Sequence, residues 1–375
     1  MGNYKIGLVG VSRGSGTVAP FSYFPETKIT ALCDLNETRL MECARHFKVN
    51  DKNCTTDFDR FLSYDFDIIV IGTPIQFHAE QVIKALEAGK HVLSEVTMAY
   101  KLEDCQRIID AVKRSGKTYM LGENCCYWPF IRQWDEWIKQ GLLGDIFYAE
   151  AEYIHNIQEL LVDEKNGETF WRLNRPPIYY CTHSLGPLLM MINDQIISVS
   201  CIDAGYSIME PKGEGCLNME VALFKTKKGK VIKLLRSQVA YREPPLHFYS
   251  LYGTRGIIES DRRGTLAHAA GGTRGLLHLK DKHYWAHQQP ERQFPFDEIY
   301  TGEIDLSAPK ETYNFEGSHG SAEHNMIRAF MDAIETGTQP FLDAPFGANI
   351  TAPGLIAHES AKLGGQWLDV PVFAW

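Results

Sequence analysis

Residues 4–16 read YKIGLVGVSRGSG, in which an apolar run ends at Gly10 and a turn rich in glycine and serine follows. A turn that binds a dinucleotide needs small residues, because backbone N–H groups must approach the pyrophosphate at a helix N-terminus. Gly10 matches the first position of the G-x-G-x-x-G pattern, whereas Ser12 and Ser15 occupy the second and third. On this pattern alone, a plain glycine-rich loop is the alternative. The residues assigned to a dinucleotide site here are Gly10, Ser12, Arg13, Gly14 and Ser15.

An acidic residue further along the chain strengthens the dinucleotide interpretation. Asp34 ends the second apolar run, at about the spacing at which a carboxylate holds the hydroxyls of the adenosine ribose. A carboxylate there repels a 2′-phosphate, so we expect NAD rather than NADP, with the guanidinium of Arg13 as an opposing influence. Pro20 falls early in the helix that should follow the turn, so we expect that helix to start late or to bend.

Short apolar runs alternate with helical patterns over the first third of the chain. Residues 78–89 and 102–116 carry apolar side chains at helical spacing, and each segment ends at a glycine. Repeated strand–helix–strand order predicts right-handed crossovers and a doubly wound α/β sheet. The strand candidates are Lys5–Val9, Lys28–Cys33, Phe66–Ile71, His91–Ser94 and Thr118–Met120.

Composition excludes several classes of protein. The 375 residues carry a formal charge of −9, which argues against a nucleic-acid partner. No apolar stretch is long enough to span a membrane, and the N-terminus enters a strand-like segment at once, so we expect neither a membrane span nor a signal peptide. Nine cysteines, an odd number without a C-x-x-C pair, predict reduced thiols in the cytoplasm rather than disulfides or a zinc cluster.

One long segment resembles the signature of a known family. Thr73-Pro74 is followed by a helix that begins near His78 and ends in Ala-Gly-Lys-His-Val, and then by Glu95. This resembles the Gfo/Idh/MocA oxidoreductases, whose signature is a Thr-Pro turn, such a helix and a Glu-Lys-Pro triplet. The resemblance extends through Gly144-Asp145 and residues 253–256 to the helix after residues 319–320. It assigns to the cofactor site Thr73, Pro74, His78, Glu95 and Asn124.

The resemblance carries expectations about the whole chain. It implies an NAD-binding Rossmann domain over residues 1–122 and a substrate domain over residues 123–375, built on a large, mostly antiparallel sheet. The active site should lie at the mouth of the nucleotide domain, against that sheet. Members of the family commonly form homo-oligomers through the outer face of the sheet, so we expect the same here.

The family pattern is broken next to Glu95, which by resemblance contacts the nicotinamide ribose. Val96 and Thr97 replace the lysine and proline of the triplet. In the sugar dehydrogenases of the family that lysine is the candidate acid/base for the hydroxyl being oxidised, and valine cannot accept a proton. The base has therefore moved elsewhere, or the chemistry is lost.

A second group of residues offers a base. The segment from Tyr180 to Pro187 reads YCTHSLGP, and Trp171-Arg172 precedes it. This resembles the family branch of NAD-dependent α-N-acetylgalactosaminidases and related redox glycosidases. Matching residue by residue gives catalytic roles to His183, Tyr153, Tyr180 and Arg172. Contact with substrate is assigned to Trp171, His155 and His319.

His183 also fits on physical grounds. Residues 185–192 read as a helix with Ser184 as its N-cap, and the positive potential at a helix N-terminus favours neutral imidazole, which is able to act as a base. The alternative is a histidine that only packs at the helix start. A divalent metal held by His155 and His183 is conceivable, but the sequence lacks tight ligand spacing, so no metal is assigned.

These features lead to hypotheses of different kinds. The first is an NAD-dependent enzyme acting on a sugar or glycoside, either by redox-neutral cleavage of the glycosidic bond or by simple dehydrogenation. The second is a nucleotide-sensing protein that kept the cofactor fold and lost the lysine. The third is a scaffold subunit that uses its sheet only for assembly.

Overall fold

The computed structural model describes residues 3–163, 165–242, 245–260, 262, 273–279, 297–301 and 321–375. Contacts within the chain divide it into two units. The first comprises Met1–Asn124, Ser307–Ala352 and Phe373–Trp375, and the second Cys125–Leu306 and Pro353–Val372. The domain boundary between residues 122 and 123 stays a prediction.

The first unit is built on a six-stranded parallel sheet in the order β3-β2-β1-β4-β5-β6. Its strands are β1 (Tyr4–Val9), β2 (Thr27–Cys33), β3 (Cys54–Thr55), β4 (Ile68–Ile71), β5 (His91–Ser94) and β6 (Tyr119–Leu121). The chain order reverses between β1 and β4, the place where such sheets bind their ligands. The predicted doubly wound sheet is confirmed; the two-residue edge strand β3 lies outside the predicted set.

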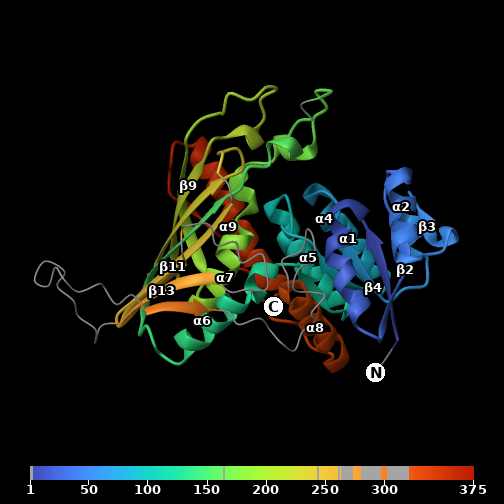
Figure 1. The fold of residues 1–375 in the computed structure, drawn as a ribbon, viewed down its shortest axis with the longest axis horizontal. Helices are drawn as coiled ribbons and strands as arrows, with labels where there is room; N and C mark the ends of the chain where they lie inside the picture. The colour runs from blue at the N-terminus through green and yellow to red at the C-terminus, as the bar shows by residue number, and fades with distance from the viewer. Residues whose placement is uncertain are drawn as a thin grey trace, which may run out of the picture. The chain divides into compact units, whose positions relative to one another are not determined.

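Helices of this unit pack against strands β1 to β5 or against one another (Figure 1). They are α1 (Val11–Val18), α2 (Glu37–Phe47), α3 (Phe58–Leu62), α4 (His78–Glu87) and α5 (Leu102–Ser115), with 3₁₀ segments η1 (Ala19–Tyr23), η2 (Asp51–Asn53) and η3 (Ile75–Phe77). Gly89 and Gly116 have positive φ just beyond α4 and α5, as predicted. A late start for the first helix was wrong: α1 begins at Val11 and becomes 3₁₀ at Ala19, with Pro20 in the first turn of η1, where a missing N–H costs least.

The outer edge of this sheet is closed by chain from far along the sequence. The backbone N–H of Leu121 in β6 donates to the carbonyl of Leu342 at 2.9 Å. The Gln339 amide accepts from the N–H of Tyr119 and donates to the carbonyl of Lys117, both at 3.1 Å. These residues connect α8 (Ser321–Thr336) to α9 (Ala344–Lys362). An edge strand that would otherwise expose unpaired groups is thereby capped.

The second unit contains a nine-stranded sheet in the order β14-β13-β12-β11-β7-β10-β9-β8-β15. Its strands are β7 (Ile146–Ile154), β8 (Ile196–Asp203), β9 (Glu220–Thr226), β10 (Val231–Ser237), β11 (Leu246–Gly253), β12 (Gly256–Ser260), β13 (Thr273–Leu279), β14 (Asp297–Thr301) and β15 (Leu368–Asp369). The pair β7–β10 is parallel and the other pairs are antiparallel. The predicted mostly antiparallel sheet is confirmed.

One helix packs on the central strands of this sheet. It is α7 (Thr182–Ile192), which contacts β7 and β11 and is buried along its whole length (Figure 1). Helix α6 (Pro129–Lys139) contacts α7. The same part of the chain contains the 3₁₀ segments η4 (Asn124–Tyr127), η5 (Gln158–Leu160), η6 (Trp171–Asn174), η7 (Pro177–Tyr180) and η8 (Glu214–Cys216). The side chains of α7 are all buried, so the helix has no solvent-facing polar side, as expected of a helix enclosed by protein.

Candidate active site

The glycine turn of the first unit has the geometry that a phosphate cradle requires. Gly10 has a φ of 82°, and a Cβ there would lie 2.5 Å from the backbone carbon of Gly72. A Cβ on Gly72 would in turn lie 2.5 Å from the Cα of Gly14. Because three backbones meet without side chains, the N-terminus of α1 is left accessible to an anion, so the turn fits the pyrophosphate of NAD.

Asp34 ties this turn to the end of β2. Its carboxylate accepts hydrogen bonds from the backbone N–H groups of Val11 and Asn36, both at 2.8 Å. Each carboxylate oxygen has a second lone pair, so the half-buried group keeps capacity for ribose hydroxyls. The predicted ribose contact therefore stays compatible with the position of Asp34.

A groove of about 620 Å³ runs beside the turn, between α1 and α2. Ser12, Arg13 and Ser15 line one side, and Arg39 lines the other and donates from Nη1 to Oγ of Ser12 at 3.1 Å. Arg39 is absent from the predicted site. Nothing in the sequence distinguishes Arg39 from an ordinary charged residue in the first turn of a surface helix.

Glu95 is buried where β5 ends and faces α1. Its carboxylate accepts a hydrogen bond from Thr17 and pairs with Nε of Arg13 at 3.2 Å. The guanidinium of Arg13 is thus engaged by Glu95, which weakens the case for Arg13 as a counterweight to Asp34. Glu95 is held in a fixed orientation, as a residue that positions a cofactor ribose should be.

His78 connects the two signature segments. One ring nitrogen lies 2.8 Å from the carbonyl oxygen of Thr73, and the other lies 2.8 Å from that of Thr97. Burial lowers the pKa of His78, and the contacts with the carbonyls of Thr97 and Thr73 oppose this effect. His78 therefore braces both the Thr73-Pro74 turn and the segment that replaces the family's Lys-Pro. Its own contact with the cofactor, like that of Asn124, whose amide donates to Glu323 at 3.3 Å, stays a prediction.

In the second unit, the predicted rings converge on β7. The ring centroid of Tyr153 lies 5.8 Å from that of His183 and 6.4 Å from that of Tyr180, and the last two lie 4.9 Å apart. The Tyr153 hydroxyl lies 3.0 Å from Nδ1 of His155. Four residues from two separate stretches of sequence thus form one cluster, which we call the tyrosine–histidine cluster.

Two strands beside β7 add residues that sequence analysis missed. Arg236 on β10 and His247 on β11 are both in register with Tyr153. The His247 ring stacks on Tyr153 at 3.9 Å, and the Arg236 guanidinium lies 4.1 Å from the Tyr153 ring centroid. Arg175 likewise lies over Tyr180, at 4.7 Å. Only the pairing of strands brings Arg236 and His247 to Tyr153, so no local pattern predicts these two residues.

The Trp-Arg pair lies at the margin of the cluster. The Arg172 guanidinium lies 4.5 Å from the Trp171 ring centroid, and Arg175 lies 5.7 Å from the same ring. Trp171 and Arg172 are both half-buried, as residues that meet a ligand from solvent should be. His319 falls outside the described residues, so its assignment stays a prediction.

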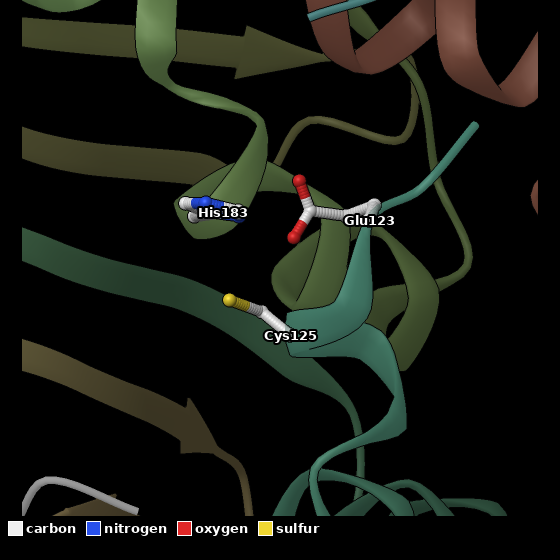
Figure 2. A group of neighbouring side chains, drawn as sticks. All are labelled: Glu123, Cys125 and His183. Atoms are coloured by element: carbon white, nitrogen blue, oxygen red, sulfur yellow. The ribbon is translucent and has the colours of Figure 1, made fainter. Parts of the chain in front are cut away.

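His183 lies in the first turn of α7, although the helix starts three residues earlier than predicted. Cys181 occupies the N-cap position without a side-chain hydrogen bond, so Ser184 is not the cap. The thiol of Cys125 and the His183 ring bring their ligand atoms within 4.8 Å of one another (Figure 2). The two ligands that this unit supplies are fewer than the three or four that hold zinc, so this pair assigns no metal.

The position of His183 depends on a substitute for a helix hydrogen bond. Pro187 lies inside α7 and lacks the N–H that would pair with the carbonyl of His183. The buried hydroxyl of Tyr249 donates to that carbonyl oxygen at 2.5 Å instead. Tyr249 thus anchors the turn that carries the imidazole.

Replacing Tyr249 by phenylalanine removes this anchor. We expect the free energy of unfolding to fall by about 1–2 kcal/mol, because a buried carbonyl loses its donor, and turnover to fall about tenfold, because the imidazole shifts. Chemical denaturation and steady-state kinetics measure the two effects. Tyr252→Phe, a half-buried position on the same strand, is the control and should change neither. Unchanged turnover in Tyr249→Phe would contradict the anchoring role.

A buried ion pair holds the segment that carries Tyr180. Glu220 on β9 accepts from the backbone N–H of Ile178 at 2.7 Å, and Nδ1 of His358 lies 2.8 Å from its other oxygen. Nε2 of His358 lies 3.3 Å from Glu214. Burial alone lowers the pKa of His358, but the hydrogen bonds and charges of Glu220 and Glu214 outweigh burial and raise it.

The sign of this shift sets a pH dependence of stability. A histidine with a raised pKa in the folded state stabilises the fold below its unfolded pKa of about 6.5, and this contribution is lost as the pH rises through the folded value. His358→Leu should therefore lower the free energy of unfolding by about 2 kcal/mol in mild acid, and by less at alkaline pH. Urea unfolding at several pH values measures the difference. A difference that grew with pH would contradict the ion pair.

Comparisons with known proteins place this geometry in a family. Residues 4–123 match the model of an oxidoreductase family with an NAD-binding Rossmann fold, Gfo/Idh/MocA. The chain is an NAD-dependent oxidoreductase whose residues 4–123 are similar to this family. The predicted family resemblance, enzyme class and cofactor NAD are confirmed. The hypotheses of a sensor and of a scaffold are therefore not supported.

Proteins similar to this oxidoreductase are matched over almost its whole length. A glycosyl hydrolase family 109 protein of Shewanella putrefaciens is 26% identical, over 99% of this chain and 86% of its own. One of Shewanella baltica is 28% identical over the same shares. Among solved structures, levoglucosan dehydrogenase in complex with NADH and L-sorbose has a TM-score of 0.80 at 20% identity and is covered completely. No helix among the described residues is long and apolar enough to cross a membrane.

Proposed function

We propose that this oxidoreductase cleaves a glycosidic bond by a redox-neutral route that uses NAD. The observation that carries the proposal is the tyrosine–histidine cluster, which offers proton acceptors in a chain whose usual lysine position is Val96. The full-length relatives named as glycosyl hydrolases support the choice of cleavage over simple dehydrogenation. The proposal requires that the nicotinamide bound by the first unit reaches a sugar ring bound by the second.

Bound NAD supplies a reversible acceptor for a hydride from a ring carbon, with the third carbon as the expected position. His183 takes the proton of the hydroxyl on that carbon as the ketone forms. Tyr153 or Tyr180 removes the proton from the neighbouring, now acidified carbon. The aglycone leaves by elimination and takes up, through solvent, the proton that the tyrosine removed. Arg172 orients a substrate oxygen. Water then adds to the double bond, His183 returns its proton, and the hydride returns to the ring.

This route differs from that of most glycosidases. They flank the bond with two carboxyl groups, one of which donates a proton directly to the leaving oxygen. The ionisable groups that the tyrosine–histidine cluster offers are phenol hydroxyls and imidazoles, and the cations beside it are arginines. Such a set suits removal of protons from a hydroxyl and from carbon better than protonation by a carboxylic acid.

The deciding experiment incubates the enzyme with aryl glycosides of several sugars in D₂O. We expect deuterium at the second ring carbon of the released sugar and no net NADH, because proton removal and return at that carbon exchange with solvent. Net NADH with an intact glycosidic bond would instead identify a simple sugar dehydrogenase. Cleavage without deuterium would exclude the elimination route.

Assembly and compartment are further proposals. Ile202, Val221 and Leu223 are 60%, 38% and 42% exposed on one face of β8 and β9, and half-exposed Trp367 lies near them, over Lys225. We propose that this face joins copies of the chain into a homo-oligomer. Sedimentation analysis of the chain and of Leu223→Lys tests this, since a charge in a buried interface should dissociate it. The nine cysteines are free, which is compatible with the expected cytoplasm.

A further inference from the structure

Two buried arginines near the tyrosine–histidine cluster have no carboxylate partner among the described residues. Arg175 is 2% exposed and Arg236 1%. Arg236 donates to the carbonyl oxygens of Tyr153 and Ser237, and Arg175 donates to the side chain of Gln238. Nε of each guanidinium has no hydrogen-bond partner within the described chain. Buried charges are normally paired, so this arrangement needs a reason.

The positive charge is directed at the rings that the proposed chemistry uses. Arg236 lies 4.1 Å from the Tyr153 ring centroid and Arg175 lies 4.7 Å from that of Tyr180. Burial and the charge of Arg236 lower the pKa of Arg175 to about 9, which still leaves it charged at neutral pH. Burial lowers the pKa of Arg236 as well, and the neighbouring Tyr153, Tyr180 and Glu220 oppose this effect. Glu220 is already paired with His358.

We propose that Arg236 is a positioning residue whose uncompensated charge stabilises the phenolate of Tyr153, so that this tyrosine serves as the base for the carbon-bound proton. The inference rests on the proposed function and selects Tyr153 over Tyr180 within it. A cation within about 4–6 Å of an acidic group favours the charged form of that group. Arg175 adds to the same positive potential from the side of Tyr180.

The other titratable groups around Tyr153 act differently. His155 on the same strand contacts its hydroxyl, His247 on β11 stacks on its ring, and His183 on α7 meets the ring edge. An imidazole that acts as a base is neutral and brings no positive charge, whereas a guanidinium carries its charge without giving up a proton. A lasting stabilisation of the phenolate therefore comes from Arg236.

Kinetics over a pH range test the proposal. In Arg236→Met, the loss of turnover on the acid side should move to higher pH by about one unit or more, because the phenolate loses its counter-charge. Arg236→Lys should restore most of the parent profile. Arg262→Met is the matched control: Arg262 lies 4.1 Å from the ring centroid of Phe248 on the same sheet and is paired with Glu152. It should leave the profile unchanged.

A spectroscopic titration tests the same point without turnover. The near-ultraviolet absorbance of the Tyr153 phenolate is obtained as the difference between a protein with Tyr153 and the same protein with Tyr153→Phe. In the Arg236→Met background this absorbance should appear at higher pH than in the parent. In the Arg236→Lys background it should appear near the parent pH. Equal titration in all three backgrounds, or an Arg236→Met variant that loses turnover uniformly over pH, would overturn the proposal. Because the titration needs no substrate, it stands even if glycosides prove not to be cleaved. If Arg236→Met fails to fold, Arg236→Gln takes its place. Titration of the Tyr153 phenolate at the same pH in Arg236→Gln as in Arg236→Lys and the parent would then overturn the proposal.

Discussion

His183→Ala lowers the turnover of a glycoside substrate by about 10²–10⁴-fold, the range that a positioned general acid/base supplies. The imidazole lies 4.9 Å from the Tyr180 ring and 5.8 Å from the Tyr153 ring, centroid to centroid. NAD binding should not change, because the glycine turn and Asp34 belong to the first unit and His183 to the second. Steady-state kinetics and titration of NAD binding separate the two quantities.

A second variant, His183→Gln, distinguishes proton transfer from packing. A glutamine side chain fills much of the same volume as histidine and can form hydrogen bonds, but it cannot take a proton near neutral pH. His183→Gln should therefore be as inactive as His183→Ala while unfolding at the parent denaturant concentration. Recovery of turnover in His183→Gln would show that the histidine only packs at the start of α7.

Gly10→Ala is expected to cost about 3–5 kcal/mol of unfolding free energy and to abolish measurable NAD binding. The new Cβ would meet the backbone of Gly72 at 2.5 Å, and a positive φ of 82° is itself unfavourable for alanine. Backbone cannot move aside as a flexible side chain can, so the first unit must distort where the pyrophosphate binds. Denaturant unfolding and NAD titration report the two losses.

Gly116→Ala supplies the matched control for this effect. Gly116 also has a positive φ, of 63°, but a Cβ there would meet nothing within 4 Å. Only the conformational penalty applies, so the expected cost is about 1 kcal/mol with unchanged NAD binding. Equal costs at the two glycines would mean that close approach to Gly72 does not govern the turn.

Local pattern was enough to predict most of the first unit. Buried parallel strands are short apolar runs, and helices that end at Gly89 and Gly116 announce their ends in sequence, so both features can be recognised residue by residue. Pro20 suggested a first helix that starts late or bends. The late start is wrong, because α1 begins at Val11, and the chain passes into 3₁₀ geometry at Ala19 and accommodates the proline there. Residue propensity shows that a proline disfavours an α-helix, but it does not show which local structure will accommodate that proline.

The site was predictable where a motif spans a few residues and not where it depends on strand pairing. Tyr180 and His183 lie in one segment, and Tyr153 was chosen by resemblance; the structure brings all three together. Arg236 sits in β10 among apolar residues, and only its register with Tyr153 gives it a role. The proposed base therefore depends on contacts that no single stretch of sequence contains.

The capped edge of β6 has a consequence for how the protein is made. A ribosome releases the chain from its N-terminus, yet the N–H of Leu121 is paired only once Leu342 has been synthesised. The strands of the nucleotide-binding unit are thus synthesised early, and the edge of the sheet at β6 stays exposed through most of translation. Nascent chains would need a chaperone, or the speed of elongation itself, to keep that edge from pairing with a neighbouring polypeptide.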